Sequence, residues 1–227
     1  MLIFATSDIH GSRQIMDELK IIAEEVDAIF LCGDLFGKEY VFDNVKTFAE
    51  HQQTDYLYLI DVLEEIEAKG VMCRYILGND DWFEANDRFR LADNWTIDGI
   101  IYHPFPFIGI TPFHTNRELE EFELREELEI LEAGQDSIIV GHMVPENCGD
   151  TLYNGEHVGS VEYQQWIEKV QPLLVLSGHI HECGLEVNEI GNTLVLNCAS
   201  EHQLDLLRGF IIDTDTMDVE PVEGAAT

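Results

Sequence analysis

The stretch Leu2-Ile3-Phe4-Ala5-Thr6-Ser7-Asp8-Ile9-His10 places a short apolar run just before an aspartate and a histidine. Apolar runs of this length are typical of buried strands. Asp8 and His10 would then lie just beyond the end of a strand. In sheets that are covered on both faces, ligands bind beyond the carboxyl ends of the strands. The first ten residues therefore predict one corner of a binding site.

Four further apolar runs end in the same way, at residues 28–32, 75–77, 137–140 and 173–177. Each run leads into a glycine and one or more polar residues, which are Asp34, Asn79, Asp80, His142, His179 and His181. We expect the glycines to let the backbone turn sharply after each strand. Five separate runs would then direct oxygen and nitrogen donors into one crevice.

The types of these side chains fit a site for two metal ions. Borderline divalent metals such as Mn, Fe, Ni and Zn take imidazole and carboxylate ligands together. One carboxylate can bridge two ions through its two oxygens. Two ions about 3.5–4 Å apart can hold a hydroxide between them and bind a phosphate. The pattern predicts a hydrolase with two divalent metal ions, and we favour Mn.

The polar segments also occur in a set order along most of the chain: Asp8-x-His10, Gly33-Asp34-x-x-Gly37, Gly78-Asn79-x-Asp81, Gly141-His142 and Gly178-His179-x-His181. This set resembles the motifs of the calcineurin-like metallophosphoesterases, in particular small bacterial and archaeal members of phosphodiesterase type. The resemblance implies an α/β fold, a four-layer sandwich in which two mixed β-sheets are flanked by helices.

The resemblance also implies a ligand set and a reaction. One metal would be held by Asp8, His10, Asp34 and His181, and the other by Asp34, Asn79, His142 and His179. Asp34 would bridge the two ions. A hydroxide between the metals would then attack the phosphorus of a small phosphate ester in line.

One position departs from the family pattern. The third motif usually reads Gly-Asn-His followed by Asp or Glu, and its histidine contacts the phosphate or protonates the leaving group. Here that position is Asp80. An aspartate beside two dications is expected to be ionised, because nearby positive charge lowers its pKa. It could not then donate a hydrogen bond, and it would repel a dianionic monoester more than a monoanionic diester. This favours small phosphodiesters as substrates.

Two other interpretations remain open. The same histidine is absent from a family member that serves as a scaffold subunit of the retromer coat, so a non-catalytic, metal-bound scaffold or interaction protein is one alternative. A phosphomonoesterase is the other. His157 lies in the glycine-rich segment 154–160 and is a candidate substrate contact or substitute proton donor, since its ordinary pKa suits that role. The competing interpretation is that His157 orders its loop. Arg13 is a candidate phosphate contact or a partner of Asp17.

Composition limits the partners. The chain has 227 residues with 45 acidic and 12 basic side chains, which gives a formal net charge of −33. A uniformly acidic surface disfavours long nucleic acids, because their binding depends on Lys and Arg. Charge of this size destabilises a compact state unless salt screens it. We therefore expect adaptation to a salt-loaded cytoplasm, as in halophilic archaea, with an acidic mesophilic protein as the alternative.

The five cysteines form no C-x-x-C pair, and Cys32, Cys73 and Cys198 lie in apolar runs. They are expected to be reduced and buried, which fits a cytoplasmic protein. Neither a signal peptide nor an apolar run of membrane-spanning length is apparent. We therefore expect no membrane association, and the sequence leaves a homo-oligomer open.

Strand and helix patterns alternate, as in α/β folds. We expect a single metallophosphoesterase domain over residues 1–227, with a helical insertion at about 38–69 as an option. The predicted helices lie at 12–26, within 40–69, at 118–132 and at 160–170. The remaining predicted elements are a pair of strands within 97–111, a hairpin at 185–197, a last strand at 208–213 and a frayed tail after Pro221.

Overall fold

The computed structural model describes residues 1–38, 44–83, 85–111 and 115–224. Its first sheet has five strands in the order β13-β12-β1-β2-β3. Strands β1, β2 and β3 run parallel to one another, β12 pairs antiparallel with β1, and β13 pairs antiparallel with β12 at the edge. The bounds are β1 Leu2–Thr6, β2 Ala28–Cys32, β3 Met72–Ile76, β12 Arg208–Asp213 and β13 Asp218–Glu223.

The second sheet has six strands in the order β10-β11-β9-β8-β5-β4. Its inner four strands are parallel, and β10 and β4 pair antiparallel at the two edges. The bounds are β4 Trp95–Ile97, β5 Ile100–Phe105, β8 Ser137–Gly141, β9 Leu174–Ser177, β10 Val187–Ile190 and β11 Thr193–Asn197. A separate two-stranded ribbon joins β6 Ile108–Ile110 to β7 Asn116–Glu118.

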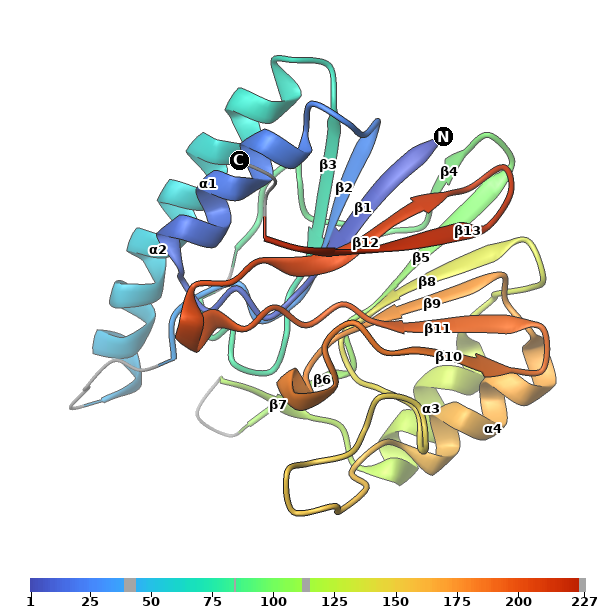
Figure 1. Cartoon of the computed structure of the whole chain (residues 1–227). Coiled ribbons are helices and arrows are strands. Elements are labelled where there is room, and N and C mark those ends of the chain that lie inside the picture. Colours follow the sequence, from blue (N-terminus) through green and yellow to red (C-terminus); the bar gives the residue numbers. More distant parts are fainter. Residues whose placement is uncertain (39–43, 84, 112–114, 225–227) are drawn as a thin grey trace.

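Helices cover the outer face of each sheet (Figure 1). Helices α1 (Arg13–Ile22) and α2 (Val45–Glu67) lie on the first sheet, and α3 (Glu121–Ile130) and α4 (Val161–Val170) lie on the second. Two one-turn helices, η1 (His181–Cys183) and η2 (His202–Leu204), lie in loops. The order helix, sheet, sheet, helix confirms the predicted four-layer α/β sandwich.

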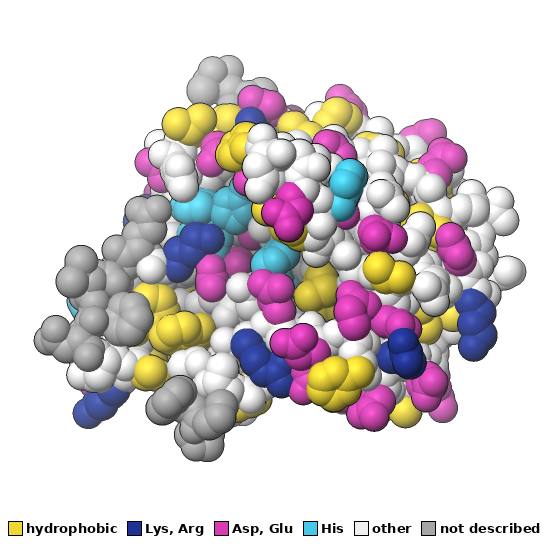
Figure 2. All heavy atoms as spheres, turned by 90° about the horizontal axis from the view of Figure 1, so that it is seen from below, with side chains coloured by type: hydrophobic (Ala, Val, Ile, Leu, Met, Phe, Trp, Pro, Cys, Tyr) yellow, Lys and Arg dark blue, Asp and Glu magenta, His cyan; other side chains and the backbone are white. Residues whose placement is uncertain are grey.

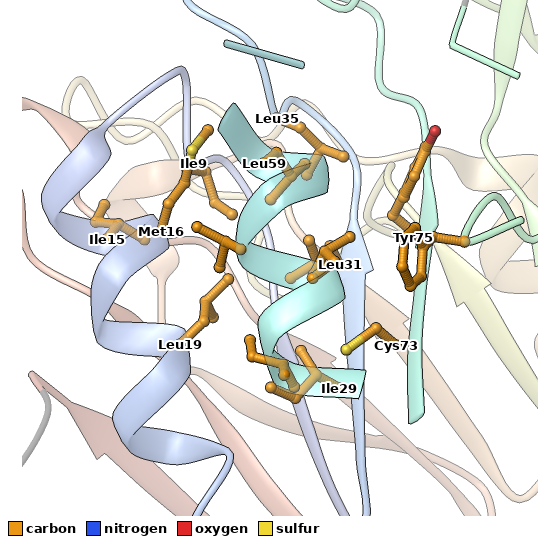
Figure 3. Close-up of a cluster of buried hydrophobic side chains, with 14 of the residues drawn as sticks. Ile9, Ile15, Met16, Leu19, Ile29, Leu31, Leu35, Leu59, Cys73 and Tyr75 are labelled. Carbon is orange, nitrogen blue, oxygen red and sulfur yellow. The ribbon is translucent and has the colours of Figure 1, made fainter. Parts of the chain in front are cut away.

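The alternation of side chains along the strands builds this layering, because successive residues point to opposite faces. In β2, Ile29 and Leu31 join the cluster beneath α1 and α2, whereas Ala28 and Phe30 join the cluster between the sheets. Figure 3 shows residues of α1 and α2 packed against β2 and β3 in the first cluster. Because both faces of each sheet are covered, the inner strands β2, β8 and β9 are fully buried and mostly apolar.

Most predicted elements are confirmed, with shifted ends. Ser12 and Ser160, the first residues of two predicted helices, are the N-caps of α1 and α4. The hairpin at 185–197 is present as β10 and β11. Helix α2 is one continuous helix, and part of the proposed insertion, residues 39–43, lies outside the described residues. Nothing tests the insertion itself or the single-domain prediction, which stay predictions.

The prediction for the C-terminal part was wrong. Strand β12 is not the last strand, because β13 follows it and pairs with it from Arg208–Glu223 to Asp213–Asp218. Pro221 stands inside β13, and the backbone N–H of Gly224 still donates to the carbonyl of Leu207 at 2.8 Å. The segment after Pro221 is therefore ordered as far as Gly224. Residues 225–227 lie outside the described part of the chain.

Two expectations from composition can be compared with the structure. All five cysteines are free and buried, as expected for Cys32, Cys73 and Cys198. Across the described residues, every helix is too short or too polar to serve as a bilayer span.

Candidate metal centre

The seven predicted ligands lie in the loops that follow β1, β2, β3, β8 and β9. These five strands belong to the parallel parts of the two sheets, so their carboxyl ends face one edge of the sandwich. The two sheets also touch there, since the backbone N–H of Ser7 donates to the carbonyl of Cys198 at 3.1 Å. From below, Figure 2 shows histidine side chains gathered in a hollow with acidic side chains around them.

The first group of potential ligands is Asp8, His10 and Asp34, whose donor atoms lie within 4.8 Å of one another. His10 Nε2 is 3.9 Å from Asp8 Oδ1 and 3.7 Å from Asp34 Oδ2. His181 Nε2 lies 3.0 Å from Asp8 Oδ1 and 3.3 Å from His10 Nε2. The structure thus brings together all four residues expected around one ion.

The second group is Asp34, His142 and His179, again with donor atoms within 4.8 Å. His142 Nε2 is 3.4 Å from Asp34 Oδ2 and 3.0 Å from Asn79 Oδ1. The rings of His142 and His179 are 5.2 Å apart. These are the four residues expected around the other ion, and Asp34 is the residue that the two groups share.

The donor set fits divalent metal ions of the borderline class. It consists of buried carboxylate oxygens, imidazole nitrogens and one amide oxygen, the mixture that Mn, Fe, Ni and Zn accept. Asp8 and Asp34 are 0% and 2% exposed. Buried carboxylates in such numbers are costly unless cations or hydrogen-bond donors compensate them. Asp8 Oδ2, for example, accepts the backbone N–H of His179 at 2.9 Å.

The backbone of these loops is strained where the ligands sit. Asp8, His10, Asp34 and His179 have φ of 58°, 44°, 53° and 70°. Residues with a Cβ rarely adopt this left-handed region, at a cost of about 1 kcal/mol or more each. Strain of this kind persists where the surrounding structure fixes it, and it clusters at functional sites. Four strained positions among seven predicted ligands agree with a functional role.

The electrostatics show how strongly the charges are coupled. Burial works against ionisation of Asp8 and Asp34, but the neighbouring histidines hold the pKa of both carboxyls well below the usual range. Burial also disfavours the charged form of His142, yet Asp34 raises its pKa to about 10. His10 is more affected by burial, which lowers its pKa to about 3. A metal ion that binds here takes the place of protons on such imidazoles.

The glycines before the ligands serve two purposes, which corrects the expectation of sharp turns at each. Gly33 has a φ of 92°, as a sharp turn requires. Gly78 has no such backbone. A Cβ at Gly78 would lie 2.1 Å from Asp34 Oδ1, so glycine is needed there for close approach. At the third motif the loop therefore packs directly on the shared aspartate.

Three buried side chains outside the ligand set hold the loops. Asp81 accepts the backbone N–H groups of Leu35, Phe36 and Gly78 at 2.8–2.9 Å, so it orders the loop of Asp34. Gln52 and Asp55 reach the same loops from α2, and Asp55 Oδ2 accepts the N–H of Gly37 at 3.0 Å. The other supporting contacts of Gln52 are to Gly37, Asp80, Trp82 and Phe83.

Asp55 is also the ion-pair partner of Arg13. The guanidinium of Arg13 lies 3.3 Å from Asp55 Oδ1 and 4.0 Å from the centre of the Tyr58 ring. Asp17, the partner expected from helical spacing, instead accepts hydrogen bonds from the Tyr58 hydroxyl at 2.9 Å. Arg13 therefore joins α1 to α2.

Asp80 lies beside the shared aspartate, and its backbone N–H donates to Asp34 Oδ1 at 2.9 Å. Its own carboxylate faces Lys38, with Oδ2 3.3 Å from Nζ. Burial and the charge of Asp34 raise the pKa of Asp80, whereas bound dications would lower it. The role of Asp80 toward substrate stays a prediction.

His157 is held by its own loop. Its Nδ1 lies 2.9 Å from Asp150 Oδ1, and the other oxygen of Asp150 accepts the N–H of Gly159 at 3.1 Å. The Asp150 carboxylate raises the pKa of His157. Among the described residues, the contacts of His157 are to Asp150 and Thr151 and not to the ligand groups. This arrangement matches the loop-ordering interpretation, and a substrate contact stays a prediction.

Two residues beside the cluster were not predicted from the sequence. The ring of His202 lies 4.3 Å from that of His10 and 4.8 Å from that of His181, so these three histidines form a further group of potential ligands. Glu118 Oε1 is 3.3 Å from His179 Nε2. His202 follows β11 as the other ligands follow their strands, and that pattern could have indicated it.

Comparisons with known proteins bear on the fold and on the family. No curated protein sequence matches the chain. One solved structure superposes with a TM-score of 0.74 at 16% identity, covering 99% of both chains. The protein TT1561 of Thermus thermophilus superposes with a TM-score of 0.62 at 17% identity, covering 97% of both chains. These two likenesses show the fold. The family model described as calcineurin-like phosphoesterase matches residues 1–183, and the chain belongs to this family.

Proposed function

We propose that this protein is a phosphoesterase that uses two divalent metal ions, preferably Mn, to hydrolyse small phosphodiesters. The observation that carries the proposal is the position of Asp34, which belongs to two groups of potential ligands at once. A shared carboxylate is what two neighbouring ions require. Membership of the calcineurin-like phosphoesterase family supports the reaction class.

The ligands would divide into two sets around Asp34. Asp8, His10 and His181 would complete one site, and Asn79, His142 and His179 the other. Two ions held by these residues would supply an activated water as a nucleophile and would neutralise charge on the phosphate. The protein orients one of these ligands through its backbone. His142 Nδ1 donates to the carbonyl of Cys32 at 2.8 Å, which leaves Nε2 to face Asp34.

The test is metal content and turnover of bis(p-nitrophenyl) phosphate in the variants Asp34→Ala and His142→Ala. Asp34→Ala is expected to lose both ions, and His142→Ala one of them, each with a fall in activity of about a hundred-fold or more. The exposed His51 on α2 offers a matched control, and His51→Ala should retain both ions. If both site variants keep two metals and full activity, the assignment is wrong.

The preference for diesters rests on Asp80. Its carboxylate stands beside Asp34, where added negative charge opposes a dianionic monoester more than a monoanionic diester. The variant Asp80→His should raise monoesterase activity relative to diesterase activity, measured on matched aryl phosphates. Equal rates of the native protein on the two esters would contradict the preference and favour the monoesterase alternative.

A metal-bound scaffold would have the same ligands without turnover. Its support is the absence of a histidine at position 80. A screen of small phosphodiesters, cyclic nucleotides and phosphomonoesters with Mn, Ni, Fe and Zn separates the two functions. A protein that binds two ions and turns over none of these compounds would be the scaffold. The net charge of −33 argues against long nucleic acids in either case.

A further inference from the structure

A hollow of about 250 Å³ opens beside the ligand groups. Its lining includes His179 and His181, His202, the exposed Tyr153, and Lys38. A second hollow of about 270 Å³ adjoins it at His10 and His202. Figure 2 shows basic and acidic side chains at the rim of the histidine cluster. Both hollows are thus lined by residues of the predicted ligand groups.

Lys38 is distinctive among the described residues that line the two hollows, because it is the one Lys or Arg side chain there. It lies four residues after Asp34, in the loop that follows β2. Its side chain is 36% exposed, and its Nζ is 3.3 Å from Asp80 Oδ2. Its charge also acts on the imidazoles of His10, His181 and His202. The ammonium thus stands at the mouth of the ligand cluster.

A buried side chain of α2 holds the backbone next to Lys38. Gln52 Nε2 donates to the carbonyl of Gly37, next to Lys38, at 3.2 Å and to the carbonyl of Asp80 at 2.6 Å. One buried side chain of α2 therefore joins the two loops that carry Lys38 and Asp80. The backbone beside both members of the ion pair is thus held by the same buried residue.

The surrounding charge makes this cation unusual. The chain has 45 acidic and 12 basic residues, and basic side chains away from the site form surface ion pairs, for example Arg117 with Glu123 and Lys20 with Glu65. An anionic substrate is repelled by such a surface. An ammonium has three donors and no acceptor, so Lys38 can bind Asp80 and still donate to a second anion.

We propose that Lys38 is a substrate-binding residue whose ammonium donates a hydrogen bond to a non-bridging oxygen of the phosphate group, with Asp80 as its ion-pair partner. The inference rests on the proposed function, since it places the phosphate at the predicted metal centre. The pair supplies a donor that an ionised Asp80 lacks.

The test uses the full chain loaded with Mn and inorganic phosphate as the probe, measured by calorimetry and as inhibition of diester hydrolysis. The variant Lys38→Ala is expected to bind phosphate about ten- to a hundred-fold more weakly, which is the worth of one charge-assisted hydrogen bond. Its metal content and melting temperature should equal those of the native protein. Lys38→Arg should recover part of the loss. Lys46→Ala removes an exposed lysine paired with Glu50 on α2 and should change nothing.

The outcomes separate the two proposals. If Lys38→Ala binds phosphate as tightly as the native protein at equal metal content, the role of Lys38 is refuted and the metal site stands. Loss of metal from Lys38→Ala would also refute it, because Lys38 would then support the ligands and not the substrate. If the native protein holds two ions and binds no phosphate, the proposed function and the role of Lys38 both fail.

Discussion

Gln52 is expected to be the most important residue of this site outside the predicted ligands and the substrate contact. It lies on α2, is 0% exposed and makes four hydrogen bonds to backbone groups. Its Nε2 donates to the carbonyls of Gly37 and Asp80, and its Oε1 accepts from Trp82 and Phe83 at 2.8 and 2.9 Å. All four partners belong to the two loops that carry Asp34 and Asn79.

The size of the effect follows from these contacts. Each hydrogen bond contributes about 1 kcal/mol net, so the variant Gln52→Ala removes about 4 kcal/mol if nothing replaces the amide. Water that enters the vacated space can satisfy some of the four groups. We therefore expect a loss in the free energy of unfolding of about 2–4 kcal/mol. Metal affinity should fall as well, because the loops of both ligand groups lose their common anchor.

The assay is urea unfolding at a fixed KCl concentration, combined with bound-metal analysis. Gln53→Ala is the matched control, since its side chain is exposed one residue further along α2. The isosteric variant Gln52→Glu keeps the acceptor for Trp82 and Phe83 but turns a carboxylate oxygen toward two carbonyls, so it should also be destabilised. A Gln52→Ala protein that unfolds within about 0.5 kcal/mol of Gln53→Ala would refute the reasoning, because that is the ordinary range of surface substitutions.

Three further results are expected. The pKa of His157 is raised, so its pair with Asp150 contributes fully to stability below the ordinary pKa of about 6.5, and this contribution is lost as pH rises through the raised value. Proton NMR should find the ordinary pKa of His157 restored in the variant Asp150→Asn. An unchanged pKa in that variant would contradict the pairing. The melting temperature should rise by about 10 °C from 0.1 to 2 M KCl, as roughly 3–4 kcal/mol of repulsion is screened; a flat or falling curve would exclude the halophilic interpretation. Removal of the metal ions by a chelator should lower the melting temperature of the native protein and leave that of Asp34→Ala almost unchanged. The reason is that a ligand bound at 100 times its Kd contributes about 2.7 kcal/mol to stability. Equal shifts of the melting temperature in both proteins would place the metals elsewhere.

The sequence predicted the core of the fold because the buried strands are short and apolar on both faces. β2, for instance, reads Ala-Ile-Phe-Leu-Cys and is fully buried. The missed elements are short or polar. β13 carries three acidic residues and a proline at the edge of its sheet, and β7 is Asn-Arg-Glu. Their strand conformation is set by pairing with β12 and β6, and local sequence does not report such pairing.

The ligand groups were predictable because each ligand stands a few residues after its own strand, so local order in the sequence becomes proximity in space. Gln52 and Lys38 have no comparable signal. Gln52 lies within α2, eighteen residues beyond Asp34 along the chain, and its hydrogen bonds to the loops form only when the helix packs against them. Lys38 forms its ion pair with Asp80, which lies in the loop after a different strand, β3.

This difference has a physical consequence for the site. The ligand loops carry four left-handed residues, which local sequence alone would not hold in place. Asp81 and Gln52 fix two of the loops through backbone groups, in addition to the contacts that the ligand side chains make themselves. The positions of the ligands therefore depend on contacts from α2 and on the loop packing at Gly78. Substitutions there should weaken metal binding and stability together, whereas loss of Lys38 should weaken phosphate binding alone.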